Sequence, residues 1–144
     1  MRILALDLGE KRIGVAVSDP TGTLASSLDL LPRRNRNTDM AAIAELAARE
    51  GAEKVVVGLP ISLSGELGPQ ALLTRRFIEE LAAVLPLPIE EWDERFTTVT
   101  ALEALRAQGV SRKRRRQRVD SAAAAVLLQD YLDSHPARQR TAAP

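Results

Sequence analysis

The sequence has no cysteine and a single histidine, His135, which lies beside Pro136 near the end of the chain. Without cysteine, disulfides, thiolate nucleophiles and cysteine-based zinc sites are excluded. One histidine argues against a Ser-His-Asp triad and against a histidine-rich metal site. If the protein is an enzyme, its chemistry therefore falls to carboxylates, hydroxyls, lysine, arginine and hard metal ions.

Long apolar runs are also absent, and no stretch is long enough to span a bilayer. The N-terminus does not resemble a signal peptide, because Met1 and Arg2 lead directly into a strand-like run with a carboxylate at position 7. We therefore expect a cytoplasmic protein with no membrane partner. Aromatic residues make up only 3% of the chain, so we expect an aliphatic core, and no aromatic platform for stacking bases is evident.

The 144 residues suffice for one domain with a sizeable core. No internal repeat is visible, and no linker divides the chain before a polar tail that is rich in proline and alanine. We expect one folded domain over residues 1–133 and a disordered tail over residues 134–144.

Positive charge is concentrated in two places although the net charge is only +1. The larger basic run consists of Arg112, Lys113, Arg114, Arg115, Arg116 and Arg118, and the smaller one of Arg33, Arg34 and Arg36. Such concentration on a near-neutral chain predicts local contacts with a polyanion. A solvated surface loop is the alternative for each run.

The apolar pattern predicts a sheet that starts with antiparallel strands. The runs Ile3–Leu6 and Ile13–Val17 flank a polar turn and predict a β-hairpin. A third strand is expected at residues 24–31. The chain then alternates between helices and strands: a helix capped by Thr38 and ended by Gly51, a strand at 54–57, a breaker-rich loop at 58–69, a helix from Pro69, a strand at 89–92, a helix from Thr97 to about Gly109, and a last helix at 119–132.

This order predicts an α/β fold, with a mixed five-stranded sheet of antiparallel and then parallel strands and with helices on both faces. The first helix is expected to bury Ile43, Leu46 and Ala47. The helix from Pro69 is expected to bury a stripe of Leu73, Phe77, Leu81 and either Val84 or Leu85.

Carboxylates stand at the points where a site would form in such a sheet. Asp7 interrupts an apolar strand, and burying it is costly unless a cation meets it. Asp93 and Glu94 close the last strand, and Asp120 lies in the first turn of the last helix. If the carboxyl ends of these strands share one edge and the last helix brings Asp120 to it, three acidic groups converge. Oxygen ligands of this kind suit Mg²⁺ or Mn²⁺, and two ions about 3.5–4 Å apart could cleave a phosphodiester.

Each carboxylate also has a plain structural interpretation. Asp7 could belong to the hairpin, Glu94 could form a surface ion pair with Arg95, and Asp120 could be favoured by the helix dipole alone. It is less expected that all three carboxylates lie at one sheet edge for purely structural reasons than that any one of them does.

Four motifs follow one another along residues 2–133. They are Asp7-Leu8-Gly9 with Arg12-Ile13-Gly14-Val15-Ala16; Val57-Gly58-Leu59-Pro60 with Gly65 and Gly68-Pro69; Asp93-Glu94-Arg95-Phe96-Thr97-Thr98; and Val119-Asp120-Ser121-Ala122-Ala123 before Leu127-Leu128-Gln129-Asp130-Tyr131-Leu132. In this order the chain resembles the YqgF/RuvX-type proteins of bacteria, a family of the ribonuclease H-like superfamily related to Holliday-junction resolvases. Ser62 and Phe96 depart from the family pattern, which has Asn and more often Leu there, and neither is a carboxylate.

The resemblance implies a metal-dependent endonuclease with a ribonuclease H-like fold over residues 1–133. It implies that Asp7, Glu94 and Asp120 are the catalytic, metal-binding residues of a two-ion Mg²⁺ or Mn²⁺ site. The strand register that would decide between Asp93 and Glu94 stays open. Family members are described as processing the 5′ end of the 16S rRNA precursor and as resolving four-way DNA junctions, so RNA and DNA both stay open as partners, as do monomer and homodimer.

Binding residues follow from the same assignment. Gly58 and Gly65 are expected to let the loop backbone approach the nucleic acid. Phosphates are expected to be held by Lys11, Arg12, Arg112, Lys113, Arg114, Arg115, Arg116 and Arg118.

Two other functions fit parts of the pattern. A catalytically silent nucleic-acid-binding module would keep the basic run without needing three carboxylates. An actin-like ATPase or sugar kinase also opens with a strand, Asp-x-Gly and a hairpin, but it needs a second lobe for which this chain is too short.

Overall fold

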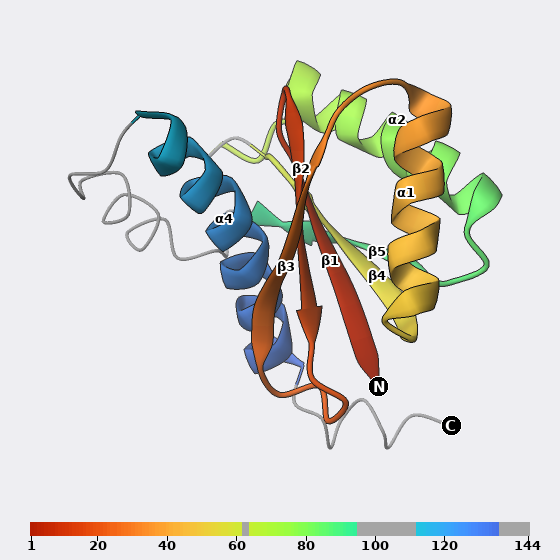
Figure 1. The fold of residues 1–144 in the computed structure, drawn as a ribbon. Coiled ribbons are helices and arrows are strands. Elements are labelled where there is room, and N and C mark those ends of the chain that lie inside the picture. Colours follow the sequence, from red (N-terminus) through yellow and green to blue (C-terminus); the bar gives the residue numbers. More distant parts are fainter. Residues whose placement is uncertain (62–63, 95–111, 136–144) are drawn as a thin grey trace.

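The computed structural model describes residues 1–61, 64–94 and 112–135, with the backbone alone for residues 112–121. Five strands form one mixed sheet in the order β3-β2-β1-β4-β5, with bounds β1 Arg2–Leu8, β2 Arg12–Ser18, β3 Ala25–Pro32, β4 Ala52–Leu59 and β5 Ile89–Asp93. The three N-terminal strands pair antiparallel, and β4 pairs parallel with both β1 and β5. The predicted fold class is confirmed, and β1 is the central strand (Figure 1).

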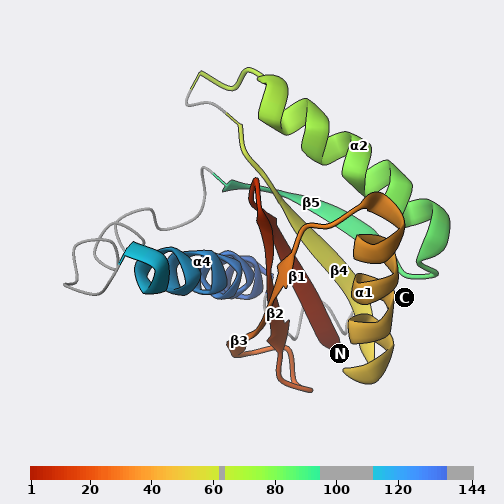
Figure 2. The same cartoon turned by 45° about the horizontal axis from the view of Figure 1, so that its top comes forward.

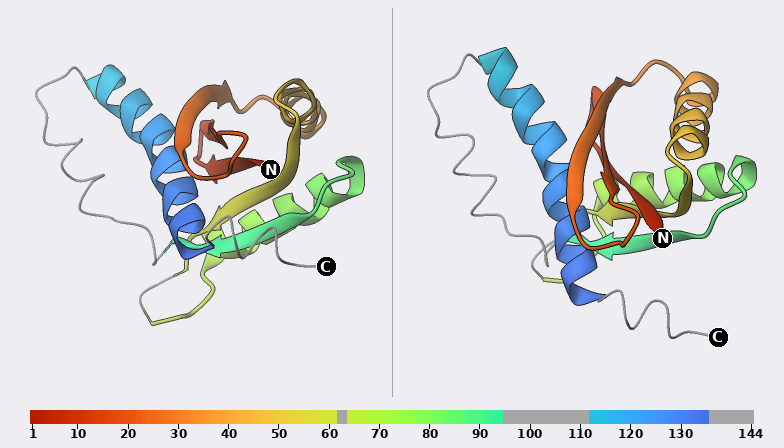
Figure 3. Two further views of the ribbon diagram at one scale, coloured as in Figure 1. Left: turned by 90° about the horizontal axis from the view of Figure 1, so that it is seen from below. Right: turned by 60° about the horizontal axis from the view of Figure 1, so that its bottom comes forward.

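Helices cover both faces of this sheet. Helices α1 (Arg36–Arg49) and α2 (Pro69–Val84) lie on one face and α4 (Arg112–Ser134) on the other, an arrangement visible edge-on in Figure 2. The views in Figure 3 show α4 crossing the sheet obliquely, against β3 and β2 and toward β5. Among the described helices, none is both long enough and apolar enough to cross a membrane.

Strand β1 divides its side chains between two cores. Leu4 and Leu6 pack with α1 and α2, whereas Ile3 and Ala5 pack with Leu127 and its neighbours on α4. All four are fully buried. Because side chains alternate along a strand, the next residue in the second series is Asp7, which is therefore directed to the α4 face.

Two helix details differ from the sequence prediction. The N-cap of α1 is Asn35, whose side-chain oxygen accepts a hydrogen bond from the Thr38 backbone nitrogen at 2.9 Å. Asn caps a helix as well as Thr does, so the helix begins one turn earlier than predicted. In α2 the expected Phe77, Leu81 and Leu85 are buried. Thr74 is buried in place of Leu73, which is 60% exposed, and Val84 is 56% exposed.

Two boundaries also differ. Strand β4 continues to Leu59, so Gly58 lies in the strand and not in the following loop. Helix α4 begins at Arg112 and not near Val119. The larger basic run is thus helical, in keeping with the helix propensity of Arg, Lys and Gln and the absence of Gly and Pro from Arg112 to Ser134. The helix expected at 97–109 and residues 136–144 of the tail expected at 134–144 lie outside the described residues, whereas Ser134 ends α4 and His135 stacks on Tyr131.

Candidate functional site

Asp7 stands near the carboxyl end of the central strand. It pairs with Gly14 of β2, and it is half-buried although the four residues Ile3 to Leu6 before it are fully buried. Strand β2 pairs with it on one side, and the parallel pairing of β1 with β4 ends one residue earlier, at Leu6 and Val57. A carboxylate in this setting is fixed by the sheet and open toward the α4 side.

Glu94 reaches the same place from the edge strand. The parallel register pairs Gly58 with Trp92 and Leu59 with Asp93. Alternation then directs Glu90 and Trp92 to the α4 face, where Trp92 packs edge-on against Tyr131 at a ring-centroid distance of 5.4 Å. Glu94 continues this series, whereas Asp93 belongs to the opposite one. The geometry therefore favours Glu94 over Asp93 as the partner of Asp7.

Gly58 creates the space that Glu94 occupies. A Cβ atom at position 58 would lie 2.6 Å from Glu94 Oε1 and would also overlap the Leu127 Cδ1 methyl group. No other residue type fits this point of β4 without displacing one of the two side chains. The sequence analysis expected Gly58 to let a loop backbone approach the nucleic acid and missed this packing role, because the role depends on the side chains of Glu94 and Leu127 that lie opposite.

The two carboxyl groups interact strongly. Burial of the Glu94 carboxyl, the negative charge of Asp7, a hydrogen bond with Asp7 and the charge of Asp93 together raise the pKa of Glu94 to about 8. Near pH 7 the metal-free pair therefore holds a proton between two acidic side chains. A divalent cation would replace that proton, and the donor atoms are carboxylate oxygens, which are the ligands that Mg²⁺ and Mn²⁺ prefer.

The third predicted ligand is located by its backbone alone. Residue 120 lies in the first half of α4 and shares a helical row with Ala124, Leu127 and Tyr131, all of which are buried. Among the side chains that the structure describes, no group of three or more acidic or histidine residues converges. Asp120 as the third ligand stays a prediction.

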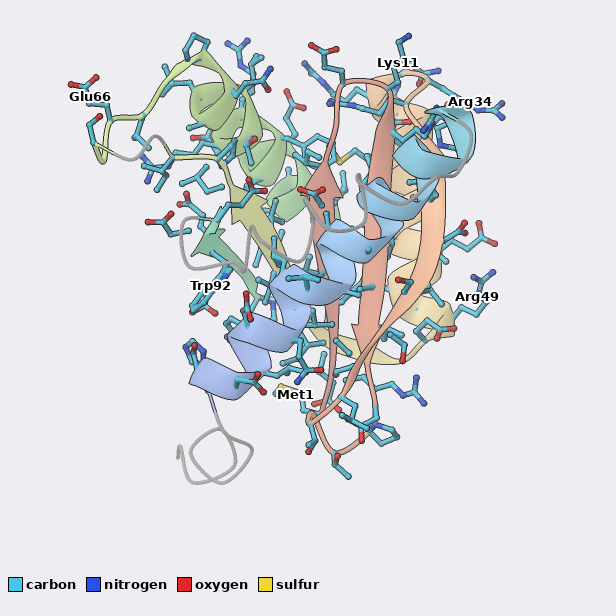
Figure 4. All side chains as sticks on the ribbon, turned by 90° about the vertical axis from the view of Figure 1, so that its left-hand side faces the viewer. Met1, Lys11, Arg34, Arg49, Glu66 and Trp92 are labelled. Atoms are coloured by element: carbon cyan, nitrogen blue, oxygen red, sulfur yellow. The ribbon has the colours of Figure 1, made fainter. Side chains whose placement is uncertain are left out.

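Basic candidates lie at the same end of the molecule as the carboxyl end of β1. Lys11 lies in the turn between β1 and β2, and Arg12 is the first residue of β2. Figure 4 shows Lys11 and Arg34 together at this end, with Met1 at the opposite one. Gly65 lies apart from these residues in the β4–α2 loop. Its φ of 87° is a backbone angle that residues other than glycine rarely adopt. For the run from Arg112 to Arg118 the structure gives the helical backbone of α4.

An aromatic cluster fixes β5 against α4. Tyr131 stacks on His135 at 4.2 Å, and its hydroxyl accepts a hydrogen bond from Lys54 Nζ at 2.7 Å. Lys54 also pairs with Glu90 at 3.2 Å. The sequence analysis left these residues out of the site. They connect β4 and β5 to α4 on the face of the sheet that carries Glu94.

The chain is similar to known proteins over nearly all of its length. The family model described as "RuvX: Holliday junction resolvase" matches residues 1–134. A protein of Symbiobacterium thermophilum is 49% identical over 138 residues, which are 96% of each chain, and one of Moorella thermoacetica is 50% identical over 133 residues, 92% of this chain and 95% of the relative. Both bear the name "Putative pre-16S rRNA nuclease".

Solved structures share the fold at low sequence identity. Thermus thermophilus RuvC in complex with a Holliday junction substrate superposes with a TM-score of 0.57 at 14% identity, over 94% of this chain and 97% of that one. The fowlpox virus Holliday junction resolvase gives 0.53 at 15% identity, over 93% and 99%. The sheet with its two helical layers is therefore the ribonuclease H-like fold of resolvases.

Proposed function

Because the chain belongs to the RuvX family of Holliday junction resolvases, we propose that Asp7, Glu94 and Asp120 are the metal ligands with which this nuclease hydrolyses phosphodiester bonds. The observation that carries the proposal is the hydrogen bond between the carboxyl groups of Asp7 and Glu94, which come from β1 and from the end of β5. Two acidic side chains held together by the fold suit a divalent cation, which can neutralise both.

The proposed role of each residue follows from its position in the fold. Asp7 is anchored in the central strand, and Glu94 is held against Gly58 and Leu127. Bound Mg²⁺ or Mn²⁺ would supply Lewis-acid stabilisation of the phosphate and lower the pKa of the attacking water. Lys11, Arg12 and the basic start of α4 would hold neighbouring phosphates without reading bases.

We propose structured precursor RNA of the small ribosomal subunit as the substrate, processed in the cytoplasm. Relatives that are 42–50% identical carry the name of pre-16S rRNA nucleases, whereas the likeness to solved junction resolvases is at 14–15% identity. A four-way DNA junction is the second candidate, because the family description names it. Paired nicking of a junction would require two active sites and hence a homodimer.

The test offers both substrates in parallel with Mg²⁺ or Mn²⁺. We expect cleavage of the precursor RNA, and we expect Asp7→Asn to lower the rate by more than about a hundredfold, the loss that even an outer-shell substitution can cause at a metal site. Binding of RNA by Asp7→Asn should be retained. Parental cleavage by that variant would disprove the site assignment, and binding without cleavage by the parent would favour the silent module.

A further inference from the structure

A groove of about 400 Å³ lies on the face of the sheet opposite Asp7 and Glu94. It runs between the loop that joins β3 to α1 and the exposed side of α2. Four arginines line it, Arg33, Arg34, Arg36 and Arg76, and its accessible apolar lining includes Leu8 and the 60% exposed Leu73. A cationic rim over an apolar floor distinguishes this groove from an ordinary charged surface.

Most of the charged partners in the groove are already engaged. Arg36 pairs with Glu80 at 2.8 Å, and the buried Asp39 accepts a hydrogen bond from the Arg34 backbone nitrogen at 3.0 Å. Arg33 lies over the Phe77 ring, with its guanidinium carbon 5.8 Å from the ring centroid. In the described part of the chain, the exposed side chains of Arg34 and Arg76 form no ion pair. The groove therefore holds positive charge that is available to an anion.

The groove also adjoins the carboxylate site along the chain. Leu8, which lines the groove, directly follows Asp7 on β1, and successive side chains point to opposite faces. Arg33 connects the groove to the hairpin turn, because its Nη1 donates to the Gly9 carbonyl at 2.9 Å and its backbone nitrogen donates to the Lys11 carbonyl at 2.8 Å. A nucleic-acid strand that leaves the carboxylate site can thus cross the end of β1 and enter the groove.

We propose that this groove binds a nucleotide of the substrate strand that flanks the cleaved bond. Arg34 and Arg76 bind the two phosphates that flank this nucleotide, and the floor of Leu8 and Leu73 contacts its sugar or base. A nucleotide combines an anion with a planar apolar surface, which is what this groove offers, whereas an acidic peptide would leave the floor unused. The inference rests on the proposed function and extends it with a second contact for the substrate, one that holds phosphate without reading sequence.

The test measures RNA binding without cleavage. Arg34→Gln/Arg76→Gln is introduced into Asp7→Asn protein, and the dissociation constant for the precursor RNA is measured in EDTA at several salt concentrations. Each lost phosphate contact should lower the slope of log K against log salt by about 0.7–0.9, so the double variant should lose about 1.4–1.8 and bind on the order of tenfold more weakly. Arg2→Gln/Arg49→Gln is the matched control, because both arginines pair with Glu50 away from the groove.

The outcomes separate this inference from the proposed function. If the double variant binds with the affinity and salt slope of the control, the groove is not a nucleotide site, whether or not the parent protein cleaves RNA. If the parent protein fails to cleave RNA but the double variant still shows a smaller salt slope for RNA binding, the proposed function is wrong and the groove is still a nucleotide-binding site. Thermal melting checks the fold. The single variants Arg34→Gln and Arg76→Gln, each expected to lose about half of the slope change, keep the test decisive if the double variant melts early.

Discussion

Gly58 and Glu94 depend on one another at the scale of single side chains. Gly58→Ala would place a methyl group 2.6 Å from Glu94 Oε1 and against Leu127. Since neither the sheet nor α4 can withdraw freely, we expect Glu94 to be displaced, cleavage to fall at least on the order of tenfold, and the free energy of unfolding to drop by about 1–3 kcal/mol. Cleavage rates and urea unfolding check both effects.

Gly68→Ala is the control for this substitution. An added Cβ there meets nothing within 4 Å, and the φ of Gly68 is −78°, which any residue adopts. Its cleavage rate should stay at the parental level. If Gly58→Ala cleaves as fast as Gly68→Ala, the position of Glu94 against β4 is not required for the reaction.

The raised pKa of Glu94 predicts a stability that depends on pH. The pKa rises from 4.5 to about 8 on folding, so the folded chain binds a proton that the unfolded chain releases. This contribution is fully present below pH 4.5 and is lost as the pH rises through 8. Metal-free parent protein should therefore lose stability across this window relative to Glu94→Gln, which has no proton to release.

Urea unfolding in EDTA from pH 5 to 9 measures that difference. Added Mg²⁺ or Mn²⁺ should restore part of the parental stability at high pH, since a ligand that binds only the folded state stabilises it, and should act less on Glu94→Gln. Parallel stability profiles of the two proteins would mean that folding does not raise the pKa of Glu94.

At the scale of elements, α4 carries both a core face and the basic run. Its second half buries Leu127, Leu128 and Tyr131, whereas its first turns contain Arg114, Arg115 and Arg116. The sequence analysis interpreted charge density as a loop, yet Arg and Lys are good helix formers and nothing between Arg112 and Ser134 interrupts a helix. Charge density alone does not separate a loop from a solvated helical turn.

Glutamine replacement of Arg114, Arg115 and Arg116 tests the basic turns without breaking the helix, because Gln and Arg have similar helix propensities. We expect binding to all sequences to weaken alike and the salt slope to fall by about 2 to 3, with an unchanged circular dichroism spectrum. A salt slope equal to that of the parent would mean that these arginines do not contact phosphates and are only a solvated surface of α4.

For the whole molecule, the sequence predicted the sheet and its two helical layers because apolar periodicity reports which face of each element is buried. It also identified Asp7, since a carboxylate in an apolar strand is visible in one dimension. It could not choose between Asp93 and Glu94, because that choice depends on the pairing of Gly58 with Trp92. It identified Arg33, Arg34 and Arg36 as a basic run, but not that Arg76 of α2 lines the same groove, since this depends on how α2 docks on the sheet.

The arrangement of the acids within one chain leads to a last prediction about the molecule as a unit. Asp7 and Glu94 meet inside a single chain, and α4 of that chain carries residue 120 on the same face of the sheet. Each molecule should therefore cleave RNA independently of any other. With RNA in excess, an equal mixture of the parent and Asp7→Asn should cleave at half the rate of the same total amount of parent protein. Paired cutting of a four-way junction by a homodimer would instead fall to a quarter, because only one dimer in four would contain two intact sites. A rate near a quarter on the precursor RNA would show that two chains act together, and it would contradict an active site that is complete in one chain.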